Sequence, residues 1–116
     1  MKLQELWFNN YARVLEIECK EKYLYSIDLY AECREAVRGD SIKIDDLNVI
    51  YGCRDKLSLS TGRVVEYCIV YVETRESIQA VNARLWSSER LGKNEIEEAR
   101  EKIRGKLENS DCKVIV

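Results

Sequence analysis

The sequence predicts a single α+β domain over residues 1–116, built on a mostly antiparallel sheet whose central strand covers about residues 64–73. Three observations favour this fold class. The length of 116 residues is typical of one domain. Residues 64–73 are apolar on both faces, which is typical of a strand covered on both sides. Segments with strand-like alternation are accompanied by two or three segments with helical spacing of apolar residues.

The N-terminal third combines both kinds of pattern. Residues 2–15 carry apolar side chains at helical spacing, whereas residues 15–19 alternate apolar and acidic side chains as in a strand. Residues 12–25 therefore fit either a helix or a strand, and the aromatic segment 23–28 fits a strand. A helix is then expected through residues 31–38, with Ser26 and Asp28 as its cap and first-turn acid and with Gly39 as its stop.

The middle of the chain predicts strands. Residues 41–52 fit one bent strand or two short ones. Residues 56–73 predict a hairpin with Thr61 and Gly62 at its turn. The second arm of this hairpin has one face made of Val64, Cys68, Val70 and Val72 and another made of Val65, Tyr67, Ile69 and Tyr71.

The C-terminal part predicts two helices and a short strand. Thr74 is expected to cap a helix that ends at Gly92, with an apolar face made of Ile78, Val81 and Leu85. Asn94 and Glu97 form a capping pattern for a second helix, whose apolar stripe is Ile96, Ala99, Ile103 and Leu107. Residues 113–116 predict a strand that pairs within the sheet. The whole order resembles the βαββαβ connectivity of ferredoxin-like domains with one extra helix, and this resemblance implies a fold without implying an activity.

The composition excludes several classes of function. The chain has no histidine, which excludes Ser-His-Asp and Cys-His catalysis and every metal site that uses imidazole. The five glycines lie at least ten residues apart, so neither a dinucleotide-binding nor a P-loop motif is present. We therefore expect no cofactor, no metal and no catalytic residue, and an enzyme is the less favoured class.

The apolar segments and the cysteines indicate in which cellular compartment the protein is expected. No segment predicts a secretory leader or a membrane span, so a cytoplasmic location without membrane contact is expected. The five cysteines are odd in number and lack a C-x-x-C pair. We therefore expect buried, reduced thiols rather than disulfides.

Aromatic residues are concentrated near the N-terminus, where six of the ten lie within the first 30 residues. One small core cannot readily bury all of them, and Tyr and Trp are the residues that anchor protein interfaces. The favoured function is a small, soluble, non-enzymatic binding or regulatory domain that acts through protein contacts and self-associates, for instance as a homodimer. The candidate protein-binding residues are Trp7, Phe8, Tyr11, Tyr23 and Tyr25.

Two other functions are weighed against this one. A small nucleic-acid-binding domain would use either the aromatic strand face around Tyr67 and Tyr71 or the basic C-terminal helices, although 19 basic against 21 acidic residues give no overall attraction to phosphate. The basic candidates are Arg84, Arg90, Lys93, Arg100 and Arg104. The third reading is a Mg²⁺-dependent nuclease, because Glu18 and Lys20 have the E-x-K spacing of such enzymes.

Overall fold

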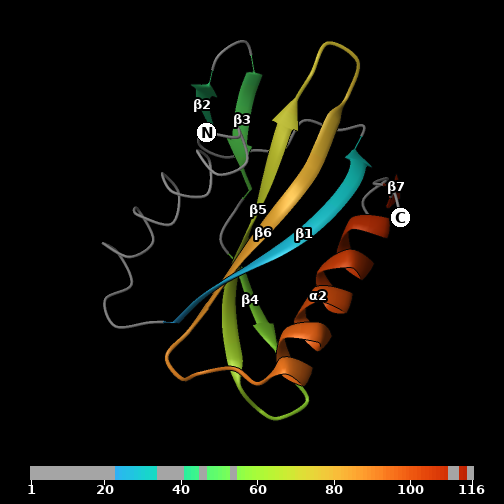
Figure 1. Ribbon diagram of the computed structural model, residues 1–116. Helices are drawn as coiled ribbons and strands as arrows, with labels where there is room; N and C mark the ends of the chain where they lie inside the picture. Colours follow the sequence, from blue (N-terminus) through green and yellow to red (C-terminus); the bar gives the residue numbers. More distant parts are fainter. Residues whose placement is uncertain (1–22, 34–40, 45–46, 53–54, 110–112, 115–116) are drawn as a thin grey trace.

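The computed structural model describes residues 23–33, 41–44, 47–52, 55–109 and 113–114. They form one antiparallel sheet of seven strands and one helix (Figure 1). The strands are β1 (Tyr23–Cys33), β2 (Ser41–Ile44), β3 (Leu47–Tyr51), β4 (Asp55–Ser58), β5 (Val64–Glu73), β6 (Ile78–Ser87) and β7 (Lys113–Val114). Their order across the sheet is β2-β3-β5-β6-β1-β7, and β4 pairs with β5.

Strand β5 is the centre of the sheet, as the sequence predicts. Its two halves have different neighbours on one side, because β4 pairs with residues 64–67 and β3 pairs with residues 70–73. On the other side it pairs with β6 along nearly its whole length. The predicted division of its side chains is confirmed from Val65 to Val72: one face contributes to a core cluster shared with the helix, and the opposite face contributes to a second cluster. Val64 departs from the prediction, because it is 54% exposed and belongs to neither cluster.

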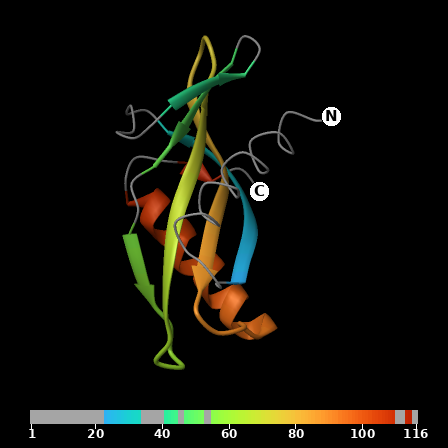
Figure 2. The same cartoon turned by 90° about the vertical axis from the view of Figure 1, so that its left-hand side faces the viewer.

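Helix α2 (Lys93–Glu108) covers one face of this sheet (Figures 1 and 2). Its buried side chains are those of Ala99, Ile103 and Leu107, which confirms most of the predicted apolar stripe. The helix begins two residues earlier than the predicted capping pattern. Gly92 is its N-cap, and the backbone N–H of Gly92 donates to the Glu95 carboxylate at 3.1 Å.

The hairpin of β4 and β5 is also confirmed. At its turn Gly62 has φ = 90°, a conformation that glycine adopts without the strain of a side chain. The N–H of Gly62 donates to the carbonyl of Leu59 at 2.9 Å, and the N–H of Leu59 donates to the carbonyl of Arg63 at 2.8 Å. Strands β2 and β3 are the two short strands of the predicted alternative for residues 41–52, and Lys113 and Val114 form the described part of the strand predicted for residues 113–116.

Two predicted helices are wrong. The helix expected between Thr74 and Gly92 is replaced by strand β6, which covers residues 78–87. The helix expected through residues 31–38 is contradicted over residues 31–33, because β1 continues to Cys33. The described residues therefore contain one helix, and their order differs from the predicted ferredoxin-like order. The segments 2–15, 15–19 and 34–38 lie outside the described residues.

A local irregularity explains the error in β6. Asp28 pairs with Asn82 and Ala31 with Ala80, so Leu29 and Tyr30 lie opposite the single residue Val81. The register of β6 against β5 shifts at the same level. Such bulges increase the twist of a strand and break its alternation of faces. The apolar residues of β6 therefore recur at a spacing that resembles a helix.

The described cysteines are in two different states. Cys68 is a buried, reduced thiol that donates to the carbonyl of Gly52 at 2.9 Å, in agreement with the predicted reduced state. Cys33 is disulfide-bonded, so the expectation of five reduced thiols is wrong. Sequence spacing could not indicate this bond, because it depends on which strands lie side by side.

Candidate functional site

The outer edge of β1 is the most distinctive exposed feature of the sheet. β1 pairs with β6 along its whole length, from Tyr23 to Cys33. On its other side the two described residues of β7 pair with Ala31 and Glu32. Among the described residues no strand pairs with residues 23–28 on that side, and Figure 2 shows this part of β1 at the margin of the sheet. We call residues 23–28, on the side away from β6, the β1 edge.

Unpaired N–H and C=O groups along such an edge form a template for another strand. The β1 edge ends, in the direction of the C-terminus, at the bulge formed by Leu29 and Tyr30, where Tyr30 has φ = 54°. A bulge interrupts the regular ladder and prevents a partner strand from continuing past it. The regular part of the β1 edge is therefore about six residues long, which is an ordinary strand length.

Two of the predicted interface tyrosines lie on this edge. Tyr23 is 49% exposed at the beginning of β1, opposite Ser87 of β6. Tyr25 is half-buried, and its hydroxyl accepts the backbone N–H of Leu91 at 2.8 Å. This bond anchors β1 to the loop before α2 and holds the Tyr25 ring against the core. Trp7, Phe8 and Tyr11 lie outside the described residues.

Polar groups line the opposite face of the same strand. The Asn82 amide donates to the Ser26 hydroxyl at 3.1 Å and to the Asp28 carboxylate at 3.4 Å. These side chains lie on the face opposite to α2 and fix the register of β1 against β6. Sequence reasoning missed this group, although the alternation of apolar and polar residues from Ser26 to Cys33 is the signal that would have revealed it.

The structure separates the predicted basic residues. Arg84 lies on β6 rather than on a helix and is 1% exposed, opposite Cys68 on the face away from α2. Arg90 precedes the helix, and its carbonyl accepts the Arg63 guanidinium at 2.6 Å. Lys93 begins α2 and is exposed, whereas Arg100 and Arg104 are half-buried on that helix. The five residues therefore do not share one exposed surface.

The aromatic strand face is covered. Tyr67, Ile69 and Tyr71 are buried in the cluster that contains the inner side chains of α2. The Tyr67 hydroxyl donates to the Asp55 carboxylate at 3.3 Å. Their rings are therefore not available for stacking on bases. Glu18 and Lys20 of the nuclease reading lie outside the described residues, and within those residues no acidic or cysteine cluster could hold a metal ion.

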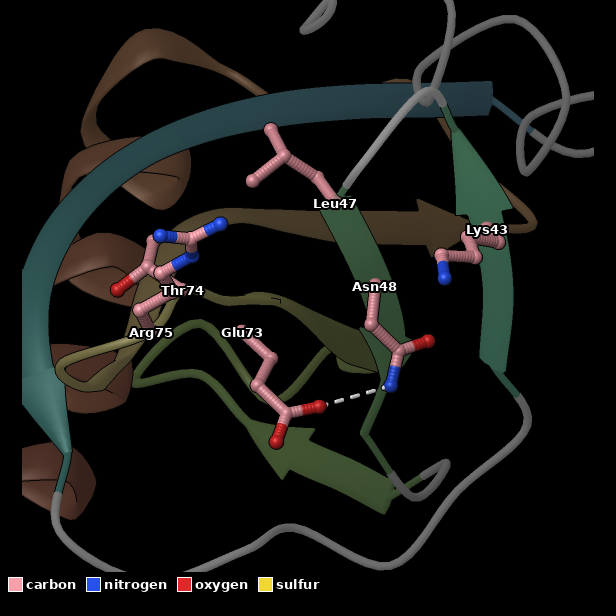
Figure 3. A pocket seen from close by; sticks show the side chains of 6 residues that line it. All are labelled: Lys43, Leu47, Asn48, Glu73, Thr74 and Arg75. Atoms are coloured by element: carbon pink, nitrogen blue, oxygen red, sulfur yellow. Dashed lines mark hydrogen bonds between the residues drawn. The ribbon is translucent and has the colours of Figure 1, made fainter.

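One hollow lies at the end of the sheet formed by β2, β3 and β5 (Figure 3). Its volume is about 800 Å³, and it is lined by Lys43, Leu47, Asn48, Glu73, Thr74 and Arg75. The Asn48 amide donates to the Glu73 carboxylate at 2.9 Å, and the Thr74 hydroxyl donates to the carbonyl of Ser77 at 3.0 Å. The lining residues offer no nucleophile paired with a base, so this hollow does not indicate catalysis.

Comparison of the chain with protein-family models, with curated proteins and with solved structures finds no match. Among the described residues, no helix is long and apolar enough to cross a membrane.

Proposed function

We propose that this chain is a small protein-interaction domain that self-associates by pairing the β1 edges of two copies. The observation that carries the proposal is the outer side of residues 23–28, which no other described strand pairs and which lies next to a regular antiparallel ladder. Addition of a strand to an open edge is a common mode of protein recognition, in which main-chain hydrogen bonds provide affinity. We also propose that the protein is cytoplasmic, as expected from the sequence.

A second copy is the partner that this edge fits best. All the strand pairs in the sheet are antiparallel, and two identical strands related by a two-fold axis are antiparallel as well. If Tyr25 lies opposite Tyr25 of the second copy, residues 23–27 pair in both chains without reaching the bulge. The two Asp28 carboxylates are then about 20 Å apart, whereas a pairing centred on Asp28 places like charges opposite each other.

Substitution of Tyr23 tests this pairing. In the Tyr25-centred pairing Tyr23 lies opposite Ile27 of the second copy, and it is already exposed in one copy. The pairing covers few residues, so a weak dimer is expected. Trp7, Phe8 and Tyr11 are proposed to enlarge the contact surface.

The test is the mass of the protein in solution as a function of concentration, from about 1 μM to about 1 mM. We expect a shift from monomer to dimer for the wild type, and a loss of at least tenfold in dimer affinity for Tyr23→Lys. Val64→Lys is the matched control, because Val64 is 54% exposed on β5, away from the β1 edge. A wild-type chain that stays monomeric throughout, or equal dimerisation of the wild type and Tyr23→Lys, would overturn the proposal.

Hydrogen exchange locates the contact independently of any substitution. Peptides that cover residues 23–28 should exchange more slowly at high protein concentration than at low concentration, whereas peptides from α2 should not change. A dimer without slower exchange in residues 23–28 would show that another surface is used.

A further inference from the structure

The hollow at the end of β2, β3 and β5 is lined mainly by charged and polar side chains (Figure 3). We propose that this hollow binds an acidic α-amino acid, with Lys43 and Arg75 holding its two carboxylates and Glu73 holding its ammonium group. This binding is independent of the self-association proposed above, because β2 and β3 lie on the opposite side of the sheet from the β1 edge.

The strand register brings three polar groups of the hollow into one row. Lys43 of β2 pairs with Asn48 of β3, and Asn48 pairs with Glu73 of β5. Directly opposite residues in an antiparallel ladder have side chains on the same face of the sheet. Adjacent strands are about 4.8 Å apart, so the backbones of Lys43 and Glu73 are separated by about 10 Å. Asn48 therefore lies between a cation and a carboxylate.

The turn from Thr74 to Ser77 places a second cation on the other side of Glu73. The backbone N–H and the hydroxyl of Thr74 both donate to the carbonyl of Ser77, at 2.9 Å and 3.0 Å. The same hydroxyl accepts the N–H of Ser77 at 3.2 Å. These bonds fix the turn, and they hold Arg75 at the end of the hollow opposite to Lys43 (Figure 3).

The charged groups of the hollow are available to a ligand. Lys43 and Arg75 are exposed, and within the described ranges neither of them makes an ion pair or a side-chain hydrogen bond. One carboxylate oxygen of Glu73 accepts the Asn48 amide at 2.9 Å, which leaves the other oxygen for a donor on the ligand. The hollow therefore presents a positive, a negative and a positive group in that order.

An acidic α-amino acid carries the complementary order of charges, because its ammonium group lies between two carboxylates. Arginine binds a carboxylate through two parallel hydrogen bonds, whereas lysine acts as a point charge on a flexible stem. The volume of about 800 Å³ is ample for such a small molecule. A dicarboxylate without an ammonium group would place its charges beside Glu73 with nothing to offset them, so the carboxylate of Glu73 selects against it.

A heteronuclear NMR titration with L-glutamate at low salt tests the site. Exposed ion pairs are individually weak, so we expect a dissociation constant on the order of 1–10 mM. Saturable shift changes should centre on the backbone amides of Lys43, Asn48 and residues 73–75, and binding should weaken in about 0.5 M NaCl.

Two analogues of L-glutamate test the order of charges. Glutarate lacks the ammonium group and 4-aminobutyrate lacks the α-carboxylate, so each should bind about fivefold more weakly than L-glutamate. No saturable change up to about 50 mM L-glutamate would overturn the proposal. Equal affinities for L-glutamate and glutarate, or for L-glutamate and inorganic phosphate, would overturn it as well, because the hollow would then be an unselective anion site.

Substitution assigns the contacts. Arg75→Gln and Lys43→Gln should each weaken the binding of L-glutamate about fivefold, and Glu73→Gln should weaken the binding of L-glutamate but strengthen that of glutarate. Lys56→Gln on β4 and Glu76→Gln in the turn are the matched controls, because both side chains are exposed and neither lines the hollow. Wild-type affinity for L-glutamate in any of the three lining variants, or an equal loss in the two controls, would contradict the assignment.

Discussion

Glu98 on α2 accepts two hydrogen bonds from Ser60, one from its backbone N–H at 2.7 Å and one from its hydroxyl. One turn earlier on the helix, Glu95 accepts the hydroxyl of Thr61 at 2.9 Å and the guanidinium of Arg63 at 3.0 Å. The acidic side of the first helical turns therefore holds the turn of the β4–β5 hairpin. Acidic groups near a helix N-terminus also interact favourably with the helix dipole.

These contacts predict a loss of stability in acid. Hydrogen bonds from Ser60 lower the pKa of Glu98 below its ordinary value of 4.5, and the N–H of Gly92 and then the hydroxyl of Thr61 lower the pKa of Glu95. A carboxylate with a lowered folded-state pKa stabilises the fold above pH 4.5, and this contribution is lost as the pH falls through the folded-state pKa. The thermal midpoint of the wild type should therefore fall between about pH 5 and pH 3.

Glu98→Gln isolates this effect. We expect a lower thermal midpoint than that of the wild type at pH 7 and a shallower decline toward pH 3. Glu97→Gln on the neighbouring, exposed position is the control and should retain the wild-type decline. Identical curves for Glu98→Gln and the wild type would show that the contact with Ser60 does not contribute.

Alkaline titration gives a second prediction. Burial, followed by the nearby Asp55 carboxylate, raises the pKa of Tyr67 to about 12. Below pH 10 the neutral hydroxyl contributes its full stabilisation, and this is lost as the pH rises through about 12. The tyrosinate absorbance of the folded protein should therefore include one late step that is absent in Tyr67→Phe. Asp55→Asn should move that step to lower pH, and a titration of Tyr67→Phe that retains the same late step would contradict this account.

The sequence predicts the elements whose pattern is local. β5 is recognisable because Val65 and Val70, on opposite faces, are equally apolar, and α2 because Ala99, Ile103 and Leu107 recur at helical spacing. β6 is not recognisable in this way. Both faces of β6 are largely buried, so its apolar and polar residues do not alternate as they do in a half-exposed strand. The bulge at Val81 also moves the residues on either side of it out of register with each other.

The candidate site could be predicted only in part. The exposure of Tyr23 follows from an excess of aromatic residues over what one small core can bury. The β1 edge does not follow from any local pattern, because it depends on where the described part of β7 pairs with β1, at Ala31 and Glu32. The disulfide of Cys33 likewise depends on which parts of the chain the fold brings together, and sequence spacing does not contain this information.

Substitution of two glycines by alanine should change the free energy of unfolding in opposite directions. A Cβ at Gly52 would lie 2.9 Å from the backbone carbonyl oxygen of Ile69 and 3.1 Å from Cε2 of Tyr71. The carbonyl belongs to the central strand and cannot move without disturbing the ladder, so Gly52→Ala should cost about 1–3 kcal/mol. Gly105 lies within α2, and a Cβ there meets nothing within 4 Å. Gly105→Ala should therefore stabilise the protein by about 0.5–1 kcal/mol, because alanine restricts the unfolded chain and favours the helix.

Urea denaturation of the wild type and the two variants measures both effects under the same conditions. Similar m-values would show that the two substitutions act on the free energy of unfolding and leave the surface exposed on unfolding unchanged. If Gly52→Ala is as stable as the wild type, then the chain at Gly52 does not pass as close to β5 as the 2.6 Å hydrogen bond from its N–H to Ile69 requires.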